Sequence, residues 1–132
     1  MSQEDAEIVR RWYADLGRSD FVAAEAKLSA GVEWDTSARG SDGGVARGID
    51  SVATVTRQWL EPWRDARFEL REIRDAGARI AAHACQHATG KLSGIEGEVE
   101  CFACFVLSKG KITAYREYPT WSQALEAAGL EE

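Results

Sequence analysis

The sequence has few of the residues that mark disordered, fibrous or disulfide-stabilised chains. Its 132 residues include two prolines, three cysteines and one methionine. So little proline excludes a Pro-rich disordered or collagen-like chain. The three cysteines, Cys85, Cys101 and Cys104, cannot all pair with one another, and each lies in an apolar run of strand type. We therefore expect reduced, buried thiols and a cytoplasmic protein.

Long hydrophobic runs and an excess of positive charge are also missing. No apolar stretch approaches the roughly 20 residues that a membrane-spanning helix needs. The acidic N-terminus lacks the basic region and the apolar segment of a signal peptide. The chain has 16 basic and 22 acidic residues, a net charge of −6. Because phosphates are bound mainly by clustered Lys and Arg, we expect neither nucleic acid nor a membrane as partner.

Tryptophan, in contrast, is abundant: the chain has five. With 45% hydrophobic and 29% charged residues, the composition predicts one globular domain over residues 1–132. A chain of this length buries about two-thirds of the surface that its unfolded form exposes. That is enough for a core that contains a cavity.

The periodicity of apolar residues changes along the chain, from helical in the first half to alternating in the second. Four helices are expected: over residues 6–16, over residues 21–29 with Asp20 as cap, from a cap at Asp50 or Ser51 to a stop at Pro62, and over residues 121–128 with Thr120 as cap. Five strands are expected, over residues 32–36, 68–74, 80–89, 95–107 and 112–118.

Short turns join the last four strands and imply an antiparallel meander. Helices that precede such a sheet must pack on one of its faces, so the sequence predicts an α+β fold. Between the first strand and the third helix, residues 37–48 are rich in Gly, Ser and Asp. This segment is expected to be an exposed loop, and it is the best candidate for a lid.

Short segments spread over nearly the whole chain carry a family resemblance. They are Gly31-Val32-Glu33-Trp34-Asp35, Ala46-Arg47-Gly48, Trp59 with Leu60-Glu61-Pro62-Trp63, Asp75-Ala76-Gly77, Ser93-Gly94-Ile95-Glu96, Gly110-Lys111-Ile112 and Ala124-Leu125-Glu126-Ala127-Ala128-Gly129-Leu130. The sequence resembles the nuclear transport factor two-like superfamily, and within it the SnoaL-like, ketosteroid-isomerase-like branch. The resemblance implies a cone-shaped, curved antiparallel sheet with the N-terminal helices on its concave face. The superfamily includes isomerases, cyclases, hydrolases and non-catalytic binders, so the activity stays open.

Alternation along the strands separates an inward from an outward face. Odd positions of residues 95–107 and even positions of residues 80–89 are the apolar, inward ones, and many of them are small. We expect a cavity for a small hydrophobic ligand, walled by tryptophans. The alternative is that the tryptophans fill this volume. The expected pocket residues are Trp12, Trp34, Thr36, Trp59, Trp63, Gln86, Cys101, Ala103 and Phe105.

Glu117 is the sharpest candidate for chemistry. The resemblance places it and Tyr115 on the concave side, where an inward Glu is suited to general acid or base catalysis. Tyr115 or Tyr13 would then stabilise an oxyanion. The alternative is a Glu at the rim, solvated or paired with an Arg such as Arg47.

The residues that ketosteroid isomerases use are not found at the corresponding positions. Ketosteroid isomerases use a base Asp, a second acid and a Tyr that donates to the oxyanion. The corresponding positions in this sequence are occupied by Thr36, by Ala103 and by Trp12, which is next to Tyr13. Steroid isomerase activity of that type is therefore not expected, and a different arrangement of Tyr13, Tyr115 and Glu117 would be required.

Two histidines flank Cys85 on one predicted strand. His83 and His87 lie about 13 Å apart and cannot share one ion, although either could join Cys85. Cross-strand pairing of these histidines with Glu98 and Glu100 explains them without a metal. We expect no metal and no cofactor.

The outer face of the sheet is more apolar than solvent exposure favours. Among charged residues, this face carries His83, Cys85, Phe102, Cys104, Val106 and Tyr118. We expect a homodimer that covers this face. The predicted function is a small-molecule pocket, either of a cofactor-free isomerase, cyclase or dehydratase for a hydrophobic carbonyl-type (polyketide, terpenoid or steroid-like) substrate, or of a non-catalytic ligand-binding or dimeric interaction module.

Overall fold

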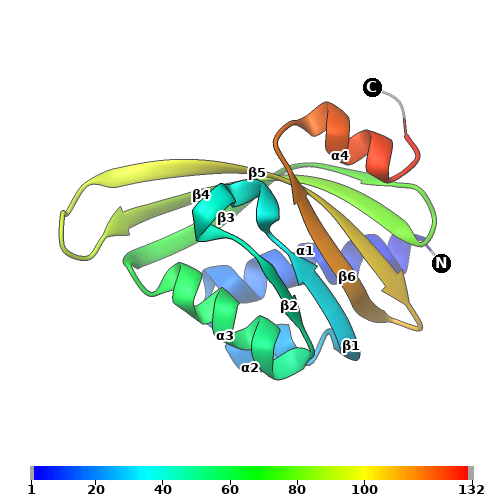
Figure 1. Cartoon of the computed structure of the whole chain (residues 1–132), viewed down its shortest axis with the longest axis horizontal. Coiled ribbons are helices and arrows are strands. Elements are labelled where there is room, and N and C mark those ends of the chain that lie inside the picture. The colour runs from blue at the N-terminus through cyan, green and yellow to red at the C-terminus, as the bar shows by residue number, and fades with distance from the viewer. Residues whose placement is uncertain (1, 131–132) are drawn as a thin grey trace.

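The computed structural model describes residues 2–130, which form a curved six-stranded sheet with helices on both of its faces (Figure 1). In chain order the elements are α1 (Ser2–Gly17), α2 (Phe21–Glu25), β1 (Leu28–Asp35), the 3₁₀ segment η1 (Ser37–Asp42), β2 (Val45–Arg47), α3 (Ile49–Leu60), β3 (Trp63–Asp75), β4 (Arg79–Gly90), β5 (Glu96–Ser108), β6 (Lys111–Tyr118) and α4 (Trp121–Ala127).

The predicted α+β fold is confirmed. The strands follow the order β2-β1-β6-β5-β4-β3, and β3 to β6 form the predicted antiparallel meander. β1 runs antiparallel to β2 but parallel to β6, with Trp34 opposite Tyr115. The sheet is therefore mixed rather than wholly antiparallel. This one parallel pairing brings residues of the first strand against those of the last.

Two expectations at helix ends are wrong. Helix α2 ends at Glu25, and β1 already begins at Leu28, which pairs with Ile112. The backbone hydrogen bonds to β6 override the helical spacing of the apolar residues there. Helix α3 begins at Ile49, and Gly48 is its N-cap instead of Asp50 or Ser51. The amide of Gly48 donates to the carbonyl of Val32 at 2.8 Å, so the chain stays in strand geometry up to that glycine.

The caps expected for α2 and α4 are confirmed. The Asp20 carboxylate accepts from the amide of Ala23 at 3.2 Å, and the Thr120 hydroxyl accepts from the amide of Gln123 at 3.2 Å. Each cap satisfies an amide that has no partner within the helix.

Residues 37–48 are structured rather than a plain loop. They contain η1 and β2, and β2 pairs with β1 with Ala46 opposite Trp34. The amide of Thr36 donates to the carbonyl of Gly44 at 2.8 Å. A Cβ at Gly43 would lie 1.8 Å from the carbonyl oxygen of Thr36, so only glycine fits there. The segment is folded back against the sheet at this point.

The inward faces of β4 and β5 agree with the alternation of the sequence. Ala82, Ala84, Ala103 and Phe105 are fully buried in the core beneath the N-terminal helices. Ile95 was expected to be inward but lies just before β5 and is 69% exposed. The hairpin between β4 and β5 projects past the helices, so nothing covers this residue (Figure 1).

The outer face of the sheet is partly covered by the chain's own last helix (Figure 1). Leu125 and Ala128 pack against Ala81 and Cys104, which are buried as a result. Dimerisation through the remaining outer face stays a prediction, which size-exclusion chromatography with light scattering at micromolar concentration would test. Among residues 2–130, no helix combines the length and the apolar character that crossing a membrane requires.

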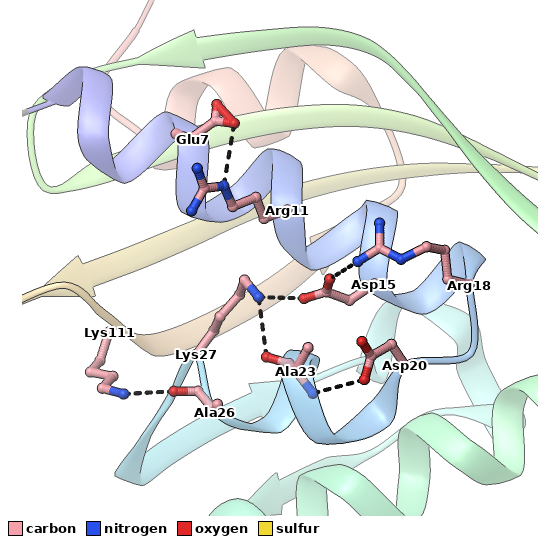
Figure 2. Close-up of polar contacts among 9 residues, drawn as sticks. All are labelled: Glu7, Arg11, Asp15, Arg18, Asp20, Ala23, Ala26, Lys27 and Lys111. Atoms are coloured by element: carbon pink, nitrogen blue, oxygen red, sulfur yellow. Dashed lines mark hydrogen bonds and ion pairs between the residues drawn. The ribbon is translucent and has the colours of Figure 1, made fainter.

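A buried carboxylate joins the first two helices to the start of the sheet (Figure 2). Asp15 has a side chain only 4% exposed and pairs with Arg18 and with Lys27. The Lys27 ammonium also donates to the carbonyl of Ala23 at 3.1 Å. Asp15 lies near the C-terminal end of α1, where the helix dipole disfavours a negative charge, so the two cations compensate it.

Candidate functional site

A cavity of about 470 Å³ lies between the concave face of the sheet, α1, α3 and the segment formed by η1 and β2. This volume is in the range of small-molecule sites. The predicted site residues that line it are Trp12, Tyr13, Trp34, Thr36, Trp59, Trp63, Gln86, Cys101, Tyr115 and Glu117. Ala103 and Phe105 are not among the lining residues. Both are fully buried, and the Phe105 ring packs edge-on against Tyr13 and Tyr115 instead.

Aromatic rings that belong to the core form the inner wall. Trp34 stacks on Tyr115 with ring centroids 4.0 Å apart and an interplanar angle of 13°. The Trp12 ring packs against Trp34, with ring centroids 5.1 Å apart. All three side chains are at most 6% exposed. The parallel pairing of β1 and β6 positions this stack, because Trp34 and Tyr115 are register partners.

Glu117 lies in the cavity wall and is 8% exposed. Its carboxylate accepts two hydrogen bonds from Arg39, from Nε to Oε1 at 2.7 Å and from Nη2 to Oε2 at 2.5 Å. The Tyr115 hydroxyl also donates to Oε2. Such paired, charge-assisted bonds fix the carboxylate in one orientation. Glu117 is therefore buried and paired, rather than solvated at the rim.

Arg39 was not among the predicted site residues. Arg47 was suggested as a partner for Glu117, but Arg47 pairs with Glu33 at 3.3 Å on the exposed side of β2. Arg39 comes from η1, inside the segment expected to be a loop, and its guanidinium also lies 4.0 Å from the centre of the Trp59 ring. Residues 37–48 contain two arginines, Arg39 and Arg47, and nothing in their spacing shows which of them approaches Glu117.

Trp59 also determines the orientation of Gln86. The indole Nε1 of Trp59 donates to the amide oxygen of Gln86 at 2.7 Å. Because an indole can only donate, the oxygen of the amide must face it. The Gln86 Nε2 group then points elsewhere, and it has no hydrogen-bond partner among the described residues although it is buried. Gln86 thus presents an unused donor beside the cavity.

Tyr13 supplies a second unused donor. Its hydroxyl is buried and has no partner within residues 2–130. Burial is the main reason that the pKa of Tyr13 is well above its usual value, with Cys101 and Glu117 adding to the effect. Burial also raises the pKa of Tyr115. Both phenols are therefore neutral hydrogen-bond donors at neutral pH.

Cys101 is expected to be an unreactive thiol. Burial raises its pKa from 9.0 to about 12, with the neighbouring Glu117 adding to the shift. Only about one thiol in ten thousand is then ionised at pH 8. Alkylation by iodoacetamide, followed by mass spectrometry of the Cys101 peptide, should be slow at pH 8 and rise about tenfold per pH unit up to pH 10.

The raised pKa of Cys101 also makes the free energy of unfolding depend on pH. Because the folded protein holds the thiol proton more tightly than the unfolded chain does, this stabilisation is fully present below pH 9 and is lost as the pH rises towards 12. Rapid alkylation of folded protein at pH 8 would contradict this description of Cys101.

Comparison with known proteins places this geometry in a family. The family model of the SnoaL-like domain matches residues 9–115. The search of curated proteins gives no match. Solved structures of the nuclear transport factor 2-like and ketosteroid isomerase-like type share the fold.

Three such structures align over most of their length. The first is a hypothetical protein with a ketosteroid isomerase-like fold from Catenulispora acidiphila, in complex with trimethylamine (18% identity, 94% of this chain and 93% of that chain, TM-score 0.75). The second is a putative SnoaL-like polyketide cyclase from Jannaschia sp. (16% identity, 89% and 86%, TM-score 0.78). The third is TerC co-crystallised with polyporic acid (16% identity, 96% and 98%, TM-score 0.75).

At these identities the activity of a similar structure cannot be assigned to this chain. The fold of these structures is nevertheless consistent with the matched family. The SnoaL-like resemblance noted in the sequence is confirmed: the chain belongs to the SnoaL-like domain family, and it shares its fold with structures of the nuclear transport factor 2-like and ketosteroid isomerase-like type.

Proposed function

We propose that the protein binds a small, largely apolar carbonyl compound in this cavity and transfers a proton on it without a cofactor, as an isomerase, cyclase or dehydratase does. The observation that carries the proposal is the convergence of one carboxylate and two unused donors on a single aromatic cavity. A carboxylate can accept a proton from a carbon next to a carbonyl group. Two neutral donors can stabilise the oxyanion that results.

Glu117 can still accept a proton although it is already hydrogen-bonded. Its Oε2 atom accepts from both Arg39 and Tyr115, whereas Oε1 accepts from Arg39 Nε alone. A carboxylate oxygen has two lone pairs, so Oε1 retains one that can take a proton from a ligand. Arg39 and Tyr115 then act as positioning residues, which hold the carboxylate while Oε1 takes the proton.

Tyr13 and Gln86 are the groups that would bind the carbonyl oxygen. Buried donors without a partner are rare, because each costs about 1–3 kcal/mol. A ligand oxygen that accepts from both groups would remove that cost. The ring stack of Trp34 and Tyr115 favours a flat, apolar body for the rest of the ligand, which agrees with an aromatic or polyketide-like compound.

A second candidate function is binding without chemistry. The observation that favours it is the number of bonds to Glu117: three donor contacts to one carboxylate also describe a structural ion pair that shapes the wall of a binding pocket. In that case the ligand would bind, but no proton would move.

A flat ketone and the matching phenol separate the two functions. The enol of 2-tetralone has nearly the shape of 2-naphthol, so the phenol mimics the intermediate of proton transfer. We expect the protein to bind 2-naphthol, measured by quenching of tryptophan fluorescence, and to accelerate exchange of the α-protons of 2-tetralone in D₂O, measured by NMR. Binding without exchange would support the second candidate, and absence of both would overturn the proposal.

The Tyr13→Phe variant tests the donor role. It removes only the hydroxyl, and that buried group has no partner in the protein, so the free energy of unfolding should not fall and should rise by up to about 3 kcal/mol. Exchange should nevertheless slow by about 10²-fold, because one oxyanion donor is lost. Thermal unfolding and the 2-tetralone assay measure the two quantities. An exchange rate equal to that of the wild type would show that Tyr13 does not act as an oxyanion donor.

A further inference from the structure

A second cluster of chemically capable side chains lies on the opposite face of the sheet, away from the cavity. One ligand atom from each of Cys85, His87 and Glu98 lies within 4.8 Å of those of the other two. Cys85 and His87 are two residues apart on β4, so their side chains share a face. Glu98 is the register partner of His87 on β5. The cluster is thus built on two paired strands, which hold it more firmly than a loop would.

His87 is held between two carboxylates. Its Nε2 atom is 3.0 Å from Oε1 of Glu69 on β3, and its Nδ1 atom is 3.4 Å from Oε1 of Glu98. If Nε2 carries the proton and donates to Glu69, the lone pair of Nδ1 faces a carboxylate oxygen. Two acceptors at that distance repel each other unless a cation lies between them, which is a second proton on the ring or a metal ion.

The third member of the cluster favours the metal ion. A proton shared by His87 and Glu98 would need no thiol, whereas Cys85 adds a sulfur ligand at the same place. Histidine bound to a metal through one nitrogen commonly donates its other N–H to a carboxylate, which is the role that Glu69 fills here. One thiolate, one imidazole and one carboxylate form a set of ligands that suits zinc.

The neighbouring charges leave Glu98 free to be a ligand. Arg71 pairs with Glu100 at 3.1 Å and lies 3.7 Å from Glu69. His83 forms its own pair with Glu100. Within residues 2–130, Glu98 has no ion-pair partner except His87, and its side chain is 62% exposed. It can therefore move by the roughly 1 Å that separates the present spacing from that of tetrahedral ligands.

We propose that Cys85, His87 and Glu98 form a zinc-binding site on the outer face of the sheet, with Glu69 positioning His87 and water as the fourth ligand. On binding, the Cys85 thiol releases its proton to solvent and the sulfur donates an electron pair to the metal. The site is independent of the cavity, because none of its residues lines it.

Cobalt(II) is the probe, because a thiolate bound to it gives a charge-transfer absorption in the near ultraviolet. We expect the full-length protein, freed of metal by chelation, to show this absorption at one cobalt per chain and to lose it when zinc is added. Cys85→Ser should abolish the absorption. His87→Gln and Glu98→Gln should weaken binding at least about tenfold.

His83→Gln is the matched control, because this histidine lies on the same strand and face but outside the cluster. Its cobalt titration should equal that of the wild type. Since Cys85 is fully buried, its variant has the greater risk of misfolding, and the exposed Glu98→Gln variant then carries the test. No thiolate absorption in the wild type, or an unchanged titration in both Glu98→Gln and His87→Gln, would overturn the proposal.

Discussion

In the Glu117→Gln variant, exchange of the α-protons of 2-tetralone is expected to fall by about 10²–10⁴-fold, the range usual for loss of a general base. The amide keeps the size of the side chain and can still accept from Tyr115 or Arg39, so the cavity keeps its shape. Binding of 2-naphthol should therefore change only a few-fold. The split between a large loss of rate and a small change of affinity is what identifies proton transfer.

Glu33→Gln is the matched control for this experiment. Glu33 lies on β1, pairs with Arg47 at 3.3 Å and has a side chain 51% exposed, so it is a carboxylate of the same sheet outside the cavity. Its variant should exchange 2-tetralone at the rate of the wild type. If Glu117→Gln also retains the full exchange rate, Glu117 acts only as part of a structural ion pair. That result would support the second candidate function, binding without chemistry.

The Asp15→Ala variant is expected to lose about 3 kcal/mol of the free energy of unfolding. Removing the carboxylate leaves the Lys27 ammonium, whose side chain is only 18% exposed, without its charged partner. For a chain of this size the loss corresponds to a fall in melting temperature of about 10 °C. Thermal and urea unfolding followed by circular dichroism measure both quantities.

The control for Asp15 is on the same helix and in the same view (Figure 2). Glu7 pairs with Arg11 at 3.6 Å, with side chains 48% and 69% exposed. Exposed helix pairs of this spacing contribute about 0.3–0.5 kcal/mol, so Glu7→Ala should hardly alter the melting temperature. Equal losses of unfolding free energy in the two variants would show that the buried ion pair of Asp15 stabilises the protein no more than the exposed pair of Glu7.

The sheet could be predicted from the sequence where one face of a strand is buried and the other is not. In β5, Glu96, Glu98 and Glu100 alternate with inward positions, and this pattern fixes which face Phe105 takes. The pattern has no information about where the helices end, and for that reason Ile95 was placed inside. Nor does it show that Leu28 finds a hydrogen-bonded partner on β6, 84 residues further along the chain.

The cavity could be predicted only in part, for a similar reason. Trp34, Tyr115 and Glu117 follow from strand alternation and from the family resemblance. Arg39 does not, because its position depends on how η1 folds back from Thr36 to Gly44. The sequence likewise showed that His83 and His87 are too far apart for one ion and that Glu98 lies across the hairpin from them. It could not show that ligand atoms of Cys85, His87 and Glu98 come within 4.8 Å of one another.

The two walls of the cavity differ in what a substitution there would disturb. Trp12, Trp34 and Tyr115 are core residues, so changes to them would cost stability as well as ligand contacts. Val45 and Val55, on the side of β2 and α3, line the same cavity but are 54% and 38% exposed. Substitutions at these two positions can alter which molecules fit while leaving the fold intact. A library varied there is the direct route to new ligand preferences, and the same freedom lets natural selection diversify such a pocket.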